Sequence, residues 1–82
     1  MIYIIKSNEY IKVGYTKDVD KRMKAYTTHN PNYELLASIQ GTTKEEAELH
    51  VLLKEYKYKT EWFMDSTIVR EIIKDYIGKT VP

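Results

Sequence analysis

The stretch Ile2-Tyr3-Ile4-Ile5-Lys6-Ser7-Asn8-Glu9-Tyr10-Ile11-Lys12-Val13-Gly14-Tyr15 decides the fold, because it holds two apolar runs on either side of a polar turn. Both runs are rich in β-branched and aromatic residues, which favour strands, whereas Ser7-Asn8-Glu9 has the composition of a turn. The stretch therefore predicts a β-hairpin. Alternation along the second strand puts Ile11 and Val13 on one face and Lys12 on the other.

The composition is that of a small folded domain. The 82 residues are enough for one core, so we expect residues 1–82 to form a single domain. The lack of cysteine excludes disulfides and thiolate zinc sites. Residues 1–5 are too short an apolar run for a signal peptide or membrane span, which favours a soluble, cytoplasmic protein. The net charge is only +1, but residues 1–24 carry more cations (Lys6, Lys12, Lys17, Lys21, Arg22 and Lys24) than acids (Glu9, Asp18 and Asp20).

A helix is expected after the hairpin. Thr16 or Asp18 can cap it, and it should run to about Thr27. Arg22 lies on or beside the apolar stripe of this helix rather than on its solvated face. An arginine in that position is expected to meet an anionic partner.

A third strand is expected next. Pro31 cannot continue a helix, which predicts a loop over residues 29–32. Residues 33–39 then have the composition of a strand that Gly41 closes. Their run Leu35-Leu36-Ala37 lacks alternation, as is typical of a central strand covered on both faces.

Two more helices complete the prediction. Thr43-Lys44-Glu45-Glu46 has the pattern of a capping box, which predicts a helix from about Lys44 to Tyr58. Glu48 is expected at the edge of its apolar face, which Ala47, Val51, Leu52 and Tyr56 form.

Residues 60–64 form a short apolar segment that should dock on the core, with Trp62 as a core residue. Asp65 or Ser66 then caps a last helix to about Ile77, which Gly78 terminates before a frayed tail over residues 79–82. Its inward residues are expected to be Ile68, Val69, Ile72, Ile73 and Tyr76. The fold class is α/β (α+β): a small three-stranded mixed or antiparallel sheet flanked by three helices.

This order and several motifs resemble the GIY-YIG nuclease domain. Met1-Ile2-Tyr3 stands where that family has Gly-Ile-Tyr, and Lys12-Val13-Gly14 stands where it has Tyr-Ile-Gly. The chain is similar, more narrowly, to a small phage and viral branch that includes the phage T5 orf172-like proteins and a family named after a meiotically up-regulated yeast gene. Its Lys-x-Gly-Tyr-Thr and Glu-Trp-Phe motifs carry that likeness, which covers Met1 to about Met64.

The resemblance implies roles for individual residues. Tyr3 would be the general base or nucleophile activator, and Lys12 would replace the second tyrosine. Arg22 would hold the scissile phosphate with its planar fork, and Tyr26 would lie one turn later on the same face. Tyr15 stands where some members carry a histidine. The remaining nucleic-acid contacts are expected from Lys21 and Lys24.

A single divalent ion, Mg²⁺ or Mn²⁺, is implied at Glu48, because one carboxylate with water and phosphate oxygens suits a hard cation. His50 is a further catalytic candidate, although it points about 200° around the helix from Glu48. The family's late asparagine has no counterpart, since Thr60 and Glu61 occupy that region, and the role of Glu61 stays open. The site is expected on a sheet face shared by Tyr3, Lys12, Arg22, Tyr26 and Glu48.

The resemblance implies a divalent-metal-dependent endonuclease that cleaves double-stranded DNA to 5′-phosphate and 3′-hydroxyl ends. Such hydrolysis needs an activated water, a cation for the phosphate and an acid or metal at the leaving oxygen. The alternative is a catalytically weak or inactive module that binds nucleic acid or a protein partner, and a third is a structural or oligomerising role. No base-reading motif is present, so specificity is either low or supplied by a homodimer or a partner protein.

Overall fold

The hairpin predicted from the sequence is present in the computed structural model of the chain. β1 (Ile2–Ser7) and β2 (Tyr10–Tyr15) pair antiparallel, with Ser7 opposite Tyr10 at the closed end. Asn8 in the turn has a φ of 56°, a left-handed conformation that asparagine adopts more readily than most residues. The prediction of a hairpin is therefore confirmed.

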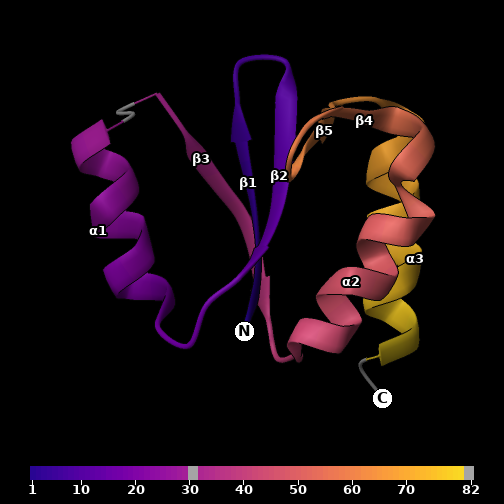
Figure 1. The fold of residues 1–82 in the computed structure, drawn as a ribbon, viewed down its shortest axis with the longest axis horizontal. Coiled ribbons are helices and arrows are strands. Elements are labelled where there is room, and N and C mark those ends of the chain that lie inside the picture. The colour runs from indigo at the N-terminus through magenta and orange to yellow at the C-terminus, as the bar shows by residue number, and fades with distance from the viewer. Residues whose placement is uncertain (30–31, 81–82) are drawn as a thin grey trace.

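The structure describes residues 1–29 and 32–80 (Figure 1). The elements that follow the hairpin are, in chain order, α1 (Val19–His29), β3 (Glu34–Ile39), α2 (Thr43–Leu52), a 3-10 turn η1 (Lys54–Tyr56), β4 (Lys57–Lys59), β5 (Trp62–Met64) and α3 (Thr67–Thr80).

Within these described ranges the fold is α+β, with one antiparallel sheet of five strands in the order β3-β1-β2-β5-β4. The expected three-stranded sheet is wrong, because β4 and β5 have only three residues each and are too short for a periodic pattern. β3 is also an edge strand rather than a central one, and its Leu35 is 40% exposed. The run Leu35-Leu36-Ala37 was expected to be covered on both faces because it does not alternate, but β3 is not covered in this way.

Helices lie on both sides of the sheet, with α1 on one side and α2 and α3 on the other (Figure 1). The strands send alternate residues to the two sides, and the core residues of β1 and β2, such as Ile4 and Val13, lie on the side of α2 and α3. Tyr3 is one residue out of phase with them and faces α1. The main core therefore lies under α2 and α3, and its buried members are Ile2, Ile4, Ile11, Val13, Leu49, Leu53, Phe63, Val69, Ile73 and Tyr76.

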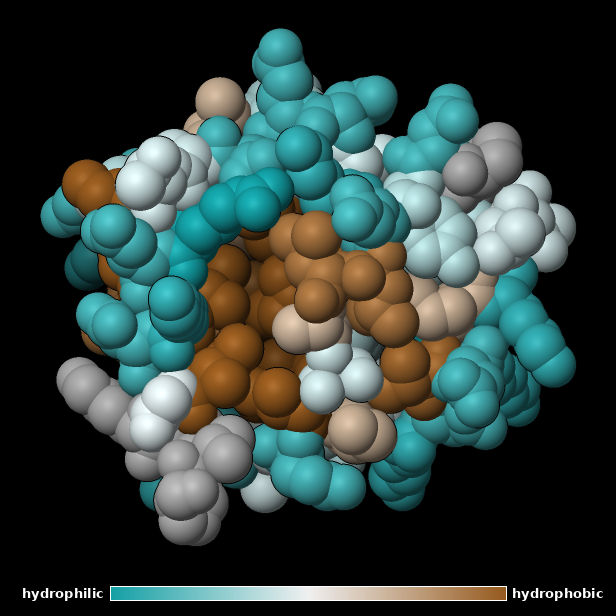
Figure 2. Space-filling view, turned by 180° about the vertical axis from the view of Figure 1, so that it is seen from behind, coloured by the Kyte–Doolittle hydropathy of each residue, from teal (hydrophilic) through white to brown (hydrophobic). Residues whose placement is uncertain are grey.

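The two helices do not cover this apolar face of the sheet completely. Seen from behind, hydrophobic side chains gather in a hollow in the middle of the molecule, with hydrophilic ones around it (Figure 2). An apolar cleft of about 180 Å³ lies between the sheet and α3, lined by Ile4, Ile11, Leu36, Ala37, Arg70, Ile73, Lys74 and Ile77.

α2 differs from its prediction in its cap, its end and its buried face. The capping box is formed by Thr42 and Glu45, one residue earlier than expected, with a bond of 3.2 Å from the Glu45 N–H to Thr42 Oγ1. The helix stops at Leu52 instead of Tyr58, because η1 and β4 follow. Leu49 and Leu53, four residues apart, are buried. Of the four residues expected inside, Tyr56 packs partly buried against the core, but three are exposed: Ala47, Val51 and Leu52.

The buried face of α2 can be tested with one substitution at two positions. Leu49→Ala should lower the free energy of unfolding by about 2–5 kcal/mol, because it leaves a cavity in the core. Leu52→Ala is the matched control, since this leucine is 52% exposed, and its effect should stay below about 0.5 kcal/mol. Urea denaturation followed by circular dichroism measures both values. Equal losses would contradict the assignment of the buried face.

One of the two cap residues expected for α1 is observed at its start. Asp18 Oδ1 accepts a hydrogen bond from the Lys21 N–H at 3.1 Å, so Asp18 is the cap rather than Thr16. The helix ends at His29, two residues beyond the expected Thr27. Of the predicted loop over residues 29–32, Asn30 and Pro31 lie outside the described residues.

α3 is capped by Ser66, whose Oγ accepts a hydrogen bond from the Val69 N–H at 3.2 Å. Gly78 does not end the helix as predicted, because α3 continues to Thr80 with no left-handed turn at that glycine. Ile68 was expected inside but is 50% exposed. Residues 81–82 of the expected tail lie outside the described residues. No helix in the described ranges is long and apolar enough to cross a membrane.

Asp65 joins the hairpin to α3 through charged contacts. Its carboxylate lies 3.1 Å from Lys6 Nζ and 2.7 Å from Arg70 Nε, and its N–H donates to the Glu9 carbonyl at 2.9 Å. The hydrogen bonds from Arg70 and, to a smaller degree, from Lys6 lower the pKa of Asp65 to about 2. The carboxylate therefore stays ionised in the folded protein at pH values where a free aspartate is protonated.

This shift predicts a pH dependence of stability. Because the pKa of Asp65 falls from 3.8 to about 2 on folding, its stabilising contribution is complete well above pH 4 and is lost as the pH falls through 2. The difference in unfolding free energy between the wild type and Asp65→Asn should therefore shrink between about pH 4 and pH 2. Urea denaturation at a series of pH values measures it, and a difference independent of pH would contradict the assignment.

Candidate active site

The side chain of Tyr3 defines the centre of the site. It is 1% exposed and extends from β1 across β2, where its paired residue is Gly14. A Cβ atom at residue 14 would lie 2.4 Å from both Cζ and the hydroxyl oxygen of Tyr3. Glycine is therefore the one residue type that leaves room for the phenol ring at this place.

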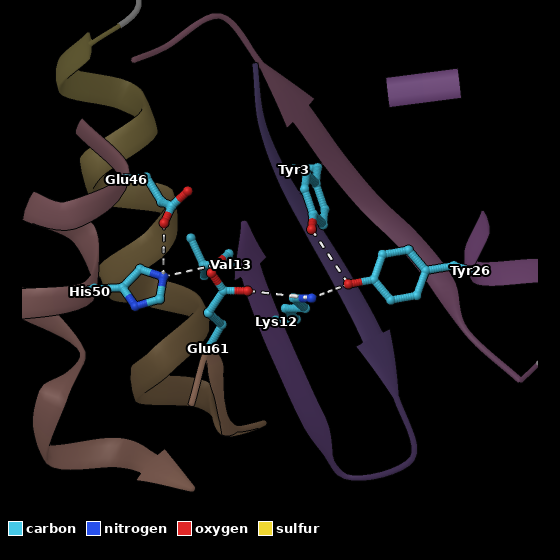
Figure 3. Close-up of polar contacts among 7 residues, drawn as sticks. All are labelled: Tyr3, Lys12, Val13, Tyr26, Glu46, His50 and Glu61. Carbon is cyan, nitrogen blue, oxygen red and sulfur yellow. Dashed lines mark hydrogen bonds and ion pairs between the residues drawn. The ribbon is translucent and has the colours of Figure 1, made fainter. Parts of the chain in front are cut away.

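Two phenols and an ammonium group form a short polar chain around Tyr3 (Figure 3). The Tyr3 and Tyr26 hydroxyl oxygens are 3.4 Å apart, and Lys12 Nζ donates a hydrogen bond to the Tyr26 hydroxyl. Lys12 Nζ also lies 4.9 Å from the centroid of the Tyr26 ring. β1, β2 and α1 thus each contribute one polar side chain to the same small volume.

Arg22 approaches the same tyrosine from α1. Its guanidinium carbon lies 5.9 Å from the centroid of the Tyr3 ring, and its side chain is exposed. Among the residues that the structure describes, no ion pair joins Arg22 to a carboxylate, so its planar fork is available to an anion. A hollow of about 380 Å³ opens beside it, lined by Thr16, Lys17, Asp18, Lys21, Arg22 and Ala25.

Glu61 supplies a carboxylate from the turn between β4 and β5. Its Oε2 lies 3.4 Å from Lys12 Nζ, and its carbonyl accepts a hydrogen bond from the Val13 N–H at 3.3 Å. The register between β2 and β5 ends at Lys12, so the Val13 carbonyl is left for a partner outside β5. Lys12 is held between a phenol and a carboxylate.

Glu46 supplies the second carboxylate, from α2. Its Oε1 lies 3.8 Å from Nε2 of His50, one helical turn later (Figure 3). The same Nε2 is 2.8 Å from the Val13 carbonyl. Since a carbonyl can only accept, Nε2 carries the proton and donates it. His50 therefore fastens α2 to the open edge of β2 and keeps Glu46 beside the site.

Glu48, the predicted metal ligand, lies elsewhere. It accepts a hydrogen bond of 2.9 Å from the Tyr76 hydroxyl and so faces α3. A shift of two residues turns a helical side chain by about 200°, which separates Glu48 from Glu46 and His50. The inner face predicted for α2 is wrong, and the glutamate that lies beside this site is Glu46 rather than Glu48. The spacing that identifies the true face is the pair Leu49 and Leu53, which leaves Glu46 and His50 on the side toward β2.

The other predicted residues lie at the margin of the site or away from it. Tyr15 is on the face of β2 opposite to Lys12, because its position alternates with that of Gly14. Lys21 lines the hollow beside Arg22, whereas Lys24 is exposed on α1 outside that lining. The structure thus groups four of the predicted side chains: Tyr3, Lys12, Arg22 and Tyr26.

Burial sets the protonation of the two central acids. It raises the pKa of Tyr3 to about 12, with help from the Tyr26 hydrogen bond, although Lys12 and Arg22 act in the opposite direction. Burial also raises the pKa of Glu46, and the nearby Glu61 adds to this effect, while His50 and Lys12 oppose it. Tyr3 is therefore a neutral phenol at pH 7, and Glu46 lies where added positive charge would be favourable.

The carboxylates are compatible with a hard divalent ion. In the part of the chain that the structure describes, no group of three or more His, Cys, Asp or Glu side chains is gathered as a metal cage. Mg²⁺ does not require one, because it commonly binds one or two carboxylates and keeps several waters. Glu46, with its raised pKa, and Glu61 are the carboxylates that fit this requirement.

Nearly the whole chain matches one family of protein domains. Residues 1–79 match the T5orf172 domain. The chain belongs to the T5orf172 family. It is also similar to uncharacterized protein 460R of Invertebrate iridescent virus 6, with 31% identity over 91 aligned residues. The alignment covers 98% of this chain but 41% of the viral protein, so the chain spans about two fifths of that relative. No solved structure matches this T5orf172 domain.

The contact between Tyr3 and Gly14 predicts a specific coupling in this T5orf172 domain. Gly14→Ala should destabilise it by about 1–3 kcal/mol, because the new methyl group overlaps the buried ring. In a Tyr3→Ala background the same substitution should cost less than about 0.5 kcal/mol, since the ring is gone. Denaturation of the four proteins in this double-mutant cycle measures the coupling. Additive effects would show that residue 14 is constrained by something other than Tyr3.

Proposed function

We propose that residues 1–82 act as a divalent-metal-dependent endonuclease that hydrolyses phosphodiester bonds in DNA, as GIY-YIG nucleases do. The observation that carries this proposal is the convergence around β2 of two cations, two phenols and two carboxylates: Tyr3, Lys12, Arg22, Tyr26, Glu46 and Glu61. Membership of the T5orf172 family supports a role related to nucleic acid.

Arg22 and Lys12 bind the scissile phosphate in this proposal. The guanidinium can pair with two phosphate oxygens, while the ammonium acts as a point charge. Both stabilise the negative charge that grows on the phosphate oxygens in the transition state. A bound phosphate would compete with Glu61 for Lys12, and this exchange is feasible because the Glu61 side chain is 47% exposed.

Glu46 is the proposed ligand of one Mg²⁺ or Mn²⁺ ion, with Glu61 as the second carboxylate in reach. Such an ion, when bound, supplies Lewis-acid stabilisation of charge on the phosphate. His50 is a positioning residue, since its proton is engaged with the Val13 carbonyl and its ring holds α2 against β2. This assignment moves the metal-binding role from Glu48 to Glu46.

Tyr3 enters the reaction as a neutral phenol, because its pKa is about 12. In that state it donates a hydrogen bond to a phosphate oxygen or to the attacking water. The base role that the resemblance implies requires more positive charge near Tyr3 than Lys12 and Arg22 provide. Tyr26 assists by fixing the positions of both Tyr3 and Lys12 through its hydroxyl group.

A second candidate function is a binding module without turnover. The ion pair between Lys12 and Glu61 and the protonated state of Tyr3 favour it, because both describe a resting site that is not set for proton abstraction. Such a module would use Arg22 and Lys12 to bind phosphate groups of nucleic acid. Its affinity would fall steeply with salt, as counterions are released from each phosphate contact.

Nicking of supercoiled plasmid DNA with Mg²⁺ or Mn²⁺ tests the proposal. Arg22→Ala and Glu46→Gln should each lower the cleavage rate by about 100-fold or more, because the first removes a cation from the phosphate and the second removes the proposed metal ligand. Glu48→Gln is the matched control for the carboxylate and should cleave within a factor of about three of the wild type, since Glu48 faces Tyr76. End labelling should identify 5′-phosphate and 3′-hydroxyl termini.

The outcomes separate the two candidates. A wild-type protein that cleaves no DNA or RNA with any divalent metal would overturn the endonuclease proposal. Salt-dependent binding without products would then favour the binding module. Loss of cleavage in Glu48→Gln but not in Glu46→Gln would return the metal-binding role to Glu48.

A further inference from the structure

A second pocket lies on the same sheet face as Lys12, beyond the site described above. Its volume is about 230 Å³, which is below the range of pockets for drug-sized ligands and suits a single ring system. Three of its six lining residues are aromatic, and none has been given a role so far. The lining comprises Ser7, Asn8, Tyr10, Tyr58, Lys59 and Trp62.

The aromatic residues form a partly open stacking surface. The Tyr10 and Tyr58 rings are nearly parallel, with centroids 4.1 Å apart and an angle of 21° between their planes. Tyr10 is half-buried, whereas Tyr58 is 56% exposed and is not part of the core. The core therefore does not explain the presence of a large aromatic residue at position 58. An exposed aromatic ring that is supported by a second, parallel ring is an arrangement on which nucleobases can stack.

Trp62 connects this pocket to the phosphate site. It lies opposite Lys12 in the β2–β5 register, and Lys12 Nζ is 5.9 Å from the centroid of its ring. Lys59, in the neighbouring strand, adds a positive charge to the pocket rim, and the exposed Asn8 amide adds hydrogen-bonding groups. One side chain, Trp62, thus lies between a cation suited to phosphate and a pocket suited to a flat ring.

We propose that this pocket binds one unpaired nucleobase of the strand whose phosphate lies at Lys12 and Arg22. The proposal rests on the proposed nucleic-acid function and narrows the substrate class. A base inside a duplex has both faces covered by its neighbours, so it cannot stack on Tyr58 without leaving the helix. The preferred substrate is therefore a single strand, a bulge or a gap in DNA or RNA rather than continuous duplex.

Binding without metal, in EDTA, tests the pocket independently of cleavage. The probes are an octamer of thymidines and an octamer of abasic tetrahydrofuran units, which have the same phosphates but differ in their bases. The wild type should bind the thymidine strand about 10-fold more tightly. Trp62 is the sole tryptophan of the sequence, and because it also lies near Lys12, the pocket is reported by a fluorescence change that the thymidine strand causes and the abasic strand does not. A uridine octamer distinguishes RNA from DNA as the source of the base.

Tyr58→Ala should remove the preference for the thymidine strand and leave abasic binding unchanged. Leu52→Ala is the matched control, because this leucine is similarly exposed but lies outside the pocket, and it should retain the preference. Circular dichroism verifies that both variants fold. Equal wild-type affinity for the two octamers, or a preference that survives in Tyr58→Ala, would overturn the proposal.

Failure of the pocket and failure of the proposed function are distinguishable. Base-dependent binding without any cleavage, in the presence of metal, supports the pocket and overturns the endonuclease activity. Plasmid nicking by a protein with no base preference supports the endonuclease and overturns the pocket. A protein that binds neither octamer overturns the pocket regardless of the nicking result.

Discussion

The packing of the Tyr3 ring against Gly14 is the contact on which the rest of the site depends. The phenol of Tyr3 crosses β2 so closely that a Cβ atom at residue 14 would overlap it. This crossing brings its hydroxyl to Tyr26 and its ring under Arg22. Close backbone packing therefore sets the position of the chemistry.

Lys12 is the electrostatic centre around which the polar groups are arranged. It is surrounded by the Tyr26 hydroxyl, the Glu61 carboxylate and the Trp62 ring, and its side chain is largely buried. Burying an ammonium group is costly unless such partners compensate for the lost water. The same partners neutralise Lys12 at rest, so under the proposed function an incoming phosphate must be a better partner for it than Glu61. Arg22, which is exposed, can make the first contact with the anion.

The sequence was sufficient for the hairpin and for α1, because local patterns determine these elements. The grouping of Tyr3, Lys12, Arg22 and Tyr26 was predicted from the resemblance to the GIY-YIG domain rather than from local patterns. The sequence was insufficient for α2, where two competing apolar sets differ by a rotation of the helix. The end of α2 at Leu52 is set by the tertiary path into η1 and β4, which no local signal indicates. The wrong set placed Glu48 beside the site, whereas the structure places Glu46 there.

The short strands were missed for a related reason, and they have the larger functional consequence. β5 pairs with β2 over three residues and then stops, and Thr60 in the turn before it has a φ of 51°. A threonine in that conformation costs about 1–3 kcal/mol and persists only where surrounding contacts enforce it. The turn places Glu61 beside Lys12, and the next residue, Trp62, lines the aromatic pocket. A longer β5 without this strained turn would pair with the Val13 carbonyl and displace His50 from it. It would also close the open edge of β2, beside which the candidate site and the aromatic pocket lie.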